Sequence, residues 1–233
     1  MAVGRIIGEK DAEHLRRKFR SEMENEVLLL LFTGGANPQY SRWTERLLAE
    51  LSQLDERIRV KVVSISEKPE LARKYGVPLK RSPTILVSPD RYMIRYTGAP
   101  VGHEAWAFIE TIVMASRGES GLSPESEQAL RELSQEYEGV LHSMVFVTPA
   151  CPYCPRQALL SNRIAVALPG RYHSEVVEAM ENPDLADKYG VSAVPDTVVL
   201  LRNGGVREVL RAVGAHPEEL FISKLVTALV SPD

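Results

Sequence analysis

The residues with the most distinctive chemistry are Cys151 and Cys154, the only two cysteines in the 233-residue chain. They lie three positions apart in Cys-Pro-Tyr-Cys, close enough in sequence to form a disulfide. The apolar run 144–147 before them predicts a buried strand, Thr-Pro-Ala ends that strand, and residues 156–168 favour a helix. A cysteine pair between a strand and the start of a helix is typical of a redox-active dithiol.

The position of each thiol predicts its role. Unpaired backbone N–H groups and the positive end of the dipole at a helix start stabilise negative charge, so Cys151 should ionise more readily than a free thiol. Cys151 is therefore the expected nucleophile. Cys154 lies one helical turn further in and is more shielded, which suits a resolving thiol. Pro152 and Tyr153 support the site, because proline is tolerated in the first helical turn.

Other interpretations of the cysteine pair are a metal site and an inert buried pair. A structural zinc site usually needs four cysteine or histidine ligands. The sequence has no second cysteine pair, and its histidines occur singly: His14, His103, His142, His173 and His216. We therefore expect neither a metal nor another cofactor.

Composition excludes several classes of partner. The chain is 44% hydrophobic with a formal net charge of −3, which gives no reason to expect nucleic acid or an anionic membrane. Its apolar runs are too short to span a bilayer, and residues 1–10 lack the apolar core of a secretory signal, so a cytoplasmic location is expected. An excess of Arg over Lys fits either a thermophilic source or a GC-rich genome.

An internal repeat organises the whole chain. A shift of 114 positions aligns residues 27–77 with 141–191 without a gap, and 16 of the 51 pairs are identical. The longest match is Lys-Tyr-Gly-Val, at 74–77 and 188–191. The chain is therefore a duplication.

Both copies predict the same order of elements. Each begins with an amphipathic helix, for which Asp11 and Ser123 are the expected N-caps. A strand, a helix, a strand (60–65 and 175–179), a short helix, a hairpin and a last helix follow. This order predicts an α/β fold in which a mixed sheet carries helices on both faces. The polar stretch 116–121 places the boundary between units 1–117 and 118–233.

The motif order resembles that of a known family. The stretch 146–155, Phe-Val-Thr-Pro-Ala-Cys-Pro-Tyr-Cys-Pro, and the tandem layout resemble the archaeal and thermophilic protein disulfide oxidoreductases, which have two thioredoxin-like units and a glutaredoxin-like CPYC. The resemblance covers essentially the whole chain. It implies that Cys151 attacks, that Cys154 resolves, and that Pro195 is the cis-proline facing the disulfide.

The sequence departs from that family at two places. The first unit has Asn37 and Tyr40 where a second CxxC is typical, so it should be a redox-inactive, degenerate site. Val145 stands where thioredoxins bury an aspartate that accepts a proton. Glu175, Glu178 or solvent must then take over this role.

The resemblance also predicts the surface that meets a substrate. A cis peptide bond is expected before Pro195 and before Pro83, and it would turn the preceding backbone towards the dithiol, where an extended peptide can pair with it. The residues expected to flank Cys151 are small or apolar: Val194, Pro195, Gly214 and Ala215. Broad specificity for protein thiols and disulfides should follow.

The sequence thus predicts an enzyme that oxidises, reduces or isomerises protein disulfides. One alternative is an electron-relay module, similar to the tandem N-terminal module of the bacterial peroxiredoxin reductase flavoprotein. No dinucleotide-binding motif follows here, so a relay would need a separate flavoprotein resembling thioredoxin reductase. Another alternative is a polypeptide-holding module with the first unit as its binding scaffold.

Overall fold

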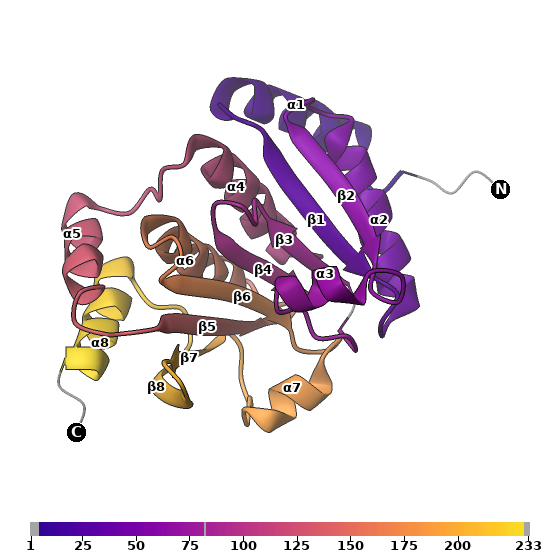
Figure 1. Ribbon diagram of the computed structural model, residues 1–233. Helices are drawn as coiled ribbons and strands as arrows, with labels where there is room; N and C mark the ends of the chain where they lie inside the picture. Colours follow the sequence, from indigo (N-terminus) through magenta and orange to yellow (C-terminus); the bar gives the residue numbers. More distant parts are fainter. Residues whose placement is uncertain (1–4, 82, 231–233) are drawn as a thin grey trace.

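The computed structural model of the chain, drawn in Figure 1, describes residues 5–81 and 83–230. The first half contains α1 (Glu9–Glu22), β1 (Val27–Thr33), α2 (Pro38–Ser52), β2 (Ile58–Ser64), α3 (Pro69–Lys74), β3 (Thr84–Val87), β4 (Met93–Thr97) and α4 (Glu104–Arg117). The second half repeats this order with α5 (Pro124–Leu133), β5 (Val140–Val147), α6 (Cys154–Ala167), β6 (Tyr172–Glu178), α7 (Pro183–Lys188), β7 (Asp196–Arg202), β8 (Val206–Val213) and α8 (Glu218–Val230). The predicted order of elements is confirmed.

One mixed sheet runs through both halves. Within the described residues its eight strands have the order β2-β1-β3-β4-β6-β5-β7-β8. Each half contributes one parallel and two antiparallel pairs, and the parallel pairing of β4 with β6 joins the halves. Two edge strands that would otherwise expose unpaired backbone groups thereby satisfy each other. The predicted division at residues 117 and 118 falls at the end of α4 and stays a prediction.

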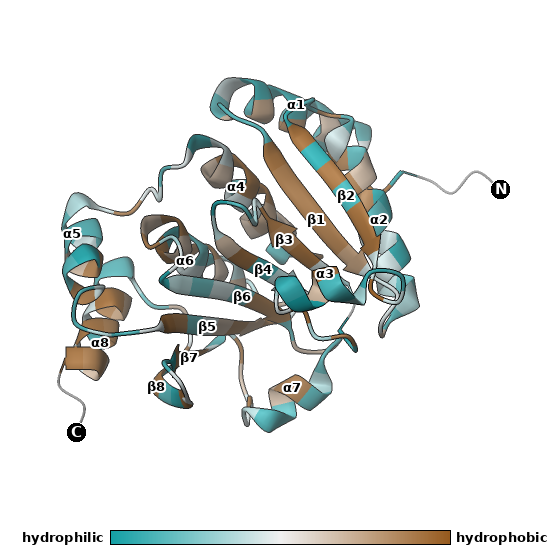
Figure 2. Cartoon of the chain, viewed as in Figure 1, coloured by the Kyte–Doolittle hydropathy of each residue, from teal (hydrophilic) through white to brown (hydrophobic). Residues whose placement is uncertain are grey.

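The two faces of the sheet carry helices of different size. One face is covered by α1, α2, α4, α5, α6 and α8 over a single continuous core, to which β1 contributes Leu29 and Leu31. Leu30 and Phe32 alternate to the other face, where α3 covers one small core and α7 covers another. Because both faces are covered, β1 is apolar almost throughout, as Figure 2 shows. The predicted helices on both faces are confirmed.

A buried polar network joins the halves on the larger face. The side-chain amide of Asn162 in α6 donates to Tyr96 Oη at 3.0 Å and to Thr111 Oγ1 at 2.9 Å, both in the first half. Its carbonyl oxygen accepts from Ser174 Oγ at 2.6 Å. All four residues are buried, so each polar group has its partner without contact with bulk water. This network fixes the relative position of α4 and α6.

Several local predictions can be compared with the structure. Ser123 caps α5 as predicted, by accepting a hydrogen bond from the backbone N–H of Ser126. The predicted N-cap Asp11 is wrong, because α1 already begins at Glu9 and Asp11 lies in its first turn. The strand predicted over 175–179 begins at Tyr172, since its first residues are buried in pairing with β4 and β5.

Candidate active site

The dithiol lies where β5 ends and α6 begins. Cys151 and Cys154 form a disulfide with their Cα atoms 5.5 Å apart. Cys154 is the first residue of α6 and is fully buried, whereas Cys151 is 8% exposed. The prediction that Cys154 lies one turn into the helix is therefore wrong, because α6 begins at this residue. The prediction that Pro152 lies in the first helical turn is also wrong, because Pro152 precedes α6. The difference in exposure between the two cysteines has the predicted sense.

The backbone at the start of α6 faces the outer sulfur atom. The N–H of Cys154 donates to Cys151 Sγ at 3.1 Å. Tyr153 is the N-cap and is 62% exposed, and Pro155 occupies the first turn. A hydrogen-bond donor and the helix dipole both favour negative charge on Cys151 Sγ once the disulfide opens. This geometry supports Cys151 as the attacking thiol.

The loop before β7 faces the disulfide. The Val194–Pro195 peptide bond is cis, as predicted, and the carbonyl oxygen of Val194 lies 3.7 Å from Cys151 Sγ. Gly214 donates its N–H to the carbonyl of Pro195 at 2.7 Å, so it lies beside this loop. Ala215 follows Gly214 and is exposed. The predicted cis bond before Pro83 involves residue 82, which lies outside the described residues.

The two carboxylates predicted to handle the proton face opposite sides of the sheet. Glu175 aligns with Met144 and lies on the α3/α7 face, where its Oε1 accepts from Thr97 Oγ1 at 2.6 Å. The prediction for Glu175 is wrong, because the sheet separates it from Cys154. Glu178 aligns with Val147 on the dithiol face. Burial raises the pKa of Glu178, although two backbone N–H groups oppose the shift.

A carboxyl group that the sequence did not single out lies on the dithiol face. Glu104, the first residue of α4, is 2% exposed, and neither carboxyl oxygen has a hydrogen-bond partner among the described residues. It lines a small cavity together with Glu178 and Val147. Burial raises the pKa of Glu104 to about 8. Glu104 is therefore protonated at neutral pH and can exchange a proton near that pH.

Packing between the halves brings Glu104 to this place. The N–H of His103 donates to the carbonyl oxygen of Pro149, two residues before Cys151, at 3.0 Å. Gly102 has a φ of 62° and lies so close to the same carbonyl that a side chain would collide with it. The start of α4 is thus held against the segment that leads to the dithiol. In the sequence, only Gly102 shortly before an acidic residue at a helix start could have drawn attention to Glu104.

The degenerate site of the first unit contacts the second unit through Asn37. Asn37 is the N-cap of α2, with Pro38 in the first turn, as the alignment predicts. Its side-chain amide donates to the carbonyl oxygen of Glu181 at 2.9 Å. Tyr40 is 39% exposed. The position that matches Cys151 therefore makes a contact between units, and neither residue can form a disulfide.

Comparisons with known proteins agree with this geometry. A family model described as a thioredoxin domain matches residues 141–227. A thioredoxin of Methanocaldococcus jannaschii is 32% identical over 81 residues, which cover 35% of this chain and 87% of that protein. The crystal structure of a protein disulfide oxidoreductase from Aeropyrum pernix is similar with a TM-score of 0.81 and 31% identity, over 96% of this chain and 94% of that one.

A longer protein is also similar. One component of the alkyl hydroperoxide reductase of Staphylococcus aureus is 26% identical over 174 residues, which cover 74% of this chain and 30% of that protein. The chain thus spans about a third of the length of such curated relatives. Within the described residues, no helix is both long and apolar enough to cross a membrane.

Proposed function

Because this chain belongs to the thioredoxin-fold protein disulfide oxidoreductases, we propose that it exchanges disulfides with protein thiols through Cys151 and Cys154. The observation that carries the proposal is the disulfide at the start of α6, with its more exposed sulfur atom beside the Val194 carbonyl. The chain has no other cysteine and therefore cannot form a second disulfide within itself. We further propose a cytoplasmic location, which agrees with the lack of purely structural disulfides.

The oxidising direction begins with a client thiolate that attacks Cys151 Sγ. The bond between the cysteines breaks, a mixed disulfide forms, and Cys154 leaves as a thiolate. A second client thiolate then attacks the client sulfur of the mixed disulfide and releases the Cys151 thiolate. The client loses two electrons and the dithiol gains them. The reducing direction is the reverse, with Cys151 as the attacking thiolate and Cys154 as the resolving one.

The buried Cys154 needs a partner for its proton. Burial disfavours a thiolate, so the leaving sulfur atom must gain a proton and the resolving thiol must lose one. Glu104 has a pKa of about 8, so it is protonated at neutral pH and both of its forms are accessible near that pH. We assign this proton exchange to Glu104, with Glu178 as the other carboxyl group at the same cavity.

The client is an extended polypeptide in this proposal. Val194 presents its backbone beside the disulfide, and an extended chain can pair with such an edge through main-chain hydrogen bonds. The flanking Pro195, Gly214 and Ala215 offer few specific side-chain contacts. Recognition would therefore depend on an exposed, extended backbone in the client rather than on one client sequence.

Reduction of insulin disulfides and oxidative refolding of a reduced client test the proposal. The wild-type protein should catalyse both, and the Cys151→Ser, Cys154→Ser double variant should catalyse neither. We expect a reduction potential between those of thioredoxin, about −270 mV, and protein disulfide isomerase, about −180 mV. Equal activity of the double variant and the wild type would contradict the proposal.

A second candidate is electron relay to a peroxiredoxin from a separate flavoprotein reductase. It is favoured by the similarity to the alkyl hydroperoxide reductase component, which extends over both units. Rapid reduction of a peroxiredoxin by this protein, with little activity on insulin, would support the relay.

A holding function is the third candidate, and a cavity in the first unit favours it. The cavity has a volume of about 450 Å³, lies between α1, α2 and α4, and is lined by both tryptophans of the chain, Trp43 and Trp106. Suppression of client aggregation by the double Ser variant would support holding without redox work.

A further inference from the structure

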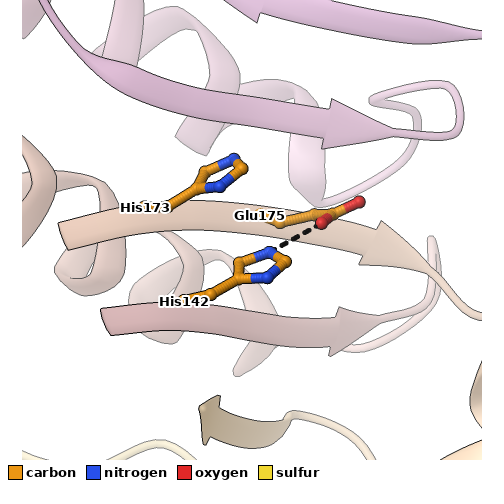
Figure 3. Close-up of side chains that lie close together, drawn as sticks. All are labelled: His142, His173 and Glu175. Atoms are coloured by element: carbon orange, nitrogen blue, oxygen red, sulfur yellow. Dashed lines mark hydrogen bonds and ion pairs between the residues drawn. The ribbon is translucent and has the colours of Figure 1, made fainter. Parts of the chain in front are cut away.

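A cluster of buried titratable side chains lies on the α3/α7 face of the sheet, away from the dithiol. His142 comes from β5, and His173 and Glu175 come from β6. The two imidazole rings are stacked, with centroids 4.4 Å apart and planes 13° from parallel. Glu175 Oε2 lies 2.8 Å from His142 Nε2. Figure 3 marks this interaction with a dashed line. The sequence separates these residues, and only the pairing of β5 with β6 brings them together.

The hydrogen bonds around His142 determine which of its nitrogens carries the proton. Arg202 Nη2 bonds to His142 Nδ1, and a guanidinium group can only donate. Nδ1 is therefore the acceptor, and Nε2 carries the proton that is donated to Glu175. Burial opposes ionisation of Glu175, but Arg95, with Nη1 at 3.3 Å, and His142 outweigh it and hold the pKa of Glu175 well below its usual range.

This arrangement does not suit a metal ion, although the three ligand atoms lie within 4.8 Å of one another. A metal would need the lone pair of His142 Nε2, which is occupied by the proton. Two guanidinium groups, of Arg95 and Arg202, also lie against the cluster, and their charge repels a cation. The surroundings favour an anion instead.

A cavity of about 390 Å³ opens beside the cluster, at the seam between the two halves. None of the described residues that line it is acidic. His173 lines it together with four cationic side chains: Arg73, Lys74, Arg95 and Arg202. Arg95 is 5% exposed, and its Nε has no hydrogen-bond partner within the described part of the chain.

Arg95 and His173 are already held in place for a ligand. Arg95 Nη2 donates to the carbonyl of Tyr75 at 2.8 Å, which fixes the guanidinium plane. His173 is 7% exposed, and neither ring nitrogen has a hydrogen-bond partner among the described residues. Burial lowers the pKa of His173 well below its usual value, so the neutral ring offers one N–H donor. Glu175 pairs with Arg95, so the excess positive charge of the cavity comes from Arg73, Lys74 and Arg202, and His173 adds an N–H donor that lacks an acceptor.

We propose that this cavity binds a small phosphate monoester. The phosphate would lie against Arg95, Arg202 and His173, because guanidinium groups match phosphate oxygens in charge and in geometry. The volume exceeds that of an inorganic phosphate and lies in the usual range of ligand pockets, so the phosphate carries an organic body. Tyr92 and Met93 line the cavity and provide a largely apolar wall for that body.

Calorimetric titration of the full chain with AMP and with inorganic phosphate, at an ionic strength held constant with sodium chloride, tests the proposal. AMP should bind saturably and more tightly than inorganic phosphate, and the ³¹P resonance of AMP should broaden. Arg202→Gln should weaken AMP binding about tenfold, because it removes one charge-assisted contact with the phosphate. Arg73→Gln should weaken it less, because it removes only a cationic side chain that lines the cavity. The matched control is Arg207→Gln, which removes the same charge from an exposed position outside the cavity.

Retained insulin reduction will show that each variant is folded, because none of these residues lies at the dithiol. Tighter binding of inorganic phosphate than of AMP would refute the proposal that the ligand carries an organic group. Absence of saturable AMP binding by the wild type would overturn the proposed site. A loss of AMP affinity in Arg207→Gln equal to that in Arg202→Gln would overturn it too. Stoichiometric binding of Zn²⁺ that His173→Gln abolishes, without binding of AMP, would replace the anion site by a metal site.

Discussion

Replacement of Glu104 by Gln should make the protein more stable at alkaline pH and slower in disulfide exchange. Glu104 is 2% exposed and has no hydrogen-bond partner among the described residues, and burial raises its pKa from 4.5 to about 8. At about 1.4 kcal/mol per pKa unit, the difference between the folded and unfolded states corresponds to a few kcal/mol, up to about 5 kcal/mol. Gln has nearly the same shape and cannot ionise.

The sign of the stability effect follows from the two pKa values. Below pH 4.5 Glu104 is protonated in both states and has no ionisation penalty. As the pH rises from 4.5 to about 8, the unfolded chain ionises while the folded chain keeps its proton, so stability falls. Above pH 8 the loss is complete. Glu104→Gln should therefore gain up to about 5 kcal/mol relative to the wild type between pH 4 and pH 9, measured by urea unfolding.

The effect on catalysis should have the opposite direction. Resolution of a mixed disulfide at Cys151 requires Cys154 to lose its proton, and removal of a general base typically costs on the order of a hundredfold in rate. The wild-type rate should rise with pH through about 8, and this rise should be absent in Glu104→Gln. Stopped-flow measurement of resolution with a client peptide tests this prediction.

Two matched variants define the outcome. Glu125→Gln makes the same change at an exposed position in the first turn of α5 and should alter neither stability nor rate. Glu178→Gln removes the other carboxyl group at the cavity and should have the smaller effect on rate. A wild-type pH profile in Glu104→Gln, or loss of the profile only in Glu178→Gln, would refute the assignment of the proton to Glu104.

Three further predictions concern the dithiol, the degenerate site and the contact between halves. Alkylation of the reduced protein at mildly acidic pH should label Cys151 before Cys154, since the outer sulfur atom is more exposed and accepts a backbone N–H; the reverse order in mass spectra would contradict their roles. Replacement of both Asn37 and Tyr40 by Cys should give a second reducible disulfide, which thiol counts will detect. Replacement of both by Ala should lower the free energy of unfolding by about 1 kcal/mol, through loss of the Asn37 hydrogen bond, and should leave insulin turnover nearly unchanged. Asn162→Leu should destabilise the protein by about 3 kcal/mol in urea unfolding, because it removes three buried hydrogen bonds, two of which join the halves, at about 1 kcal/mol each. An unchanged midpoint would show that the remaining bonds of Tyr96, Thr111 and Ser174 suffice.

The sequence determined the features that depend on local order. Two cysteines three positions apart after an apolar run define the dithiol, whatever the rest of the chain does. The 114-residue repeat determined the element order of each half, because related sequences with the same apolar periods form the same helices and strands. Gly76 and Gly190, at equivalent places, both have positive φ and end short helices.

Only the tertiary structure decided what lies next to these local elements. The pairing of β4 with β6 joins the halves into one sheet, and no local period encodes which edges will meet. That pairing places Glu104 from the first half in a small cavity beside Val147 and Glu178 of the second half. Glu175 was a reasonable sequence candidate for the proton, but strand alternation turns it to the opposite face. There it joins His142 and His173, which occur singly in the sequence and meet only through the register of β5 and β6.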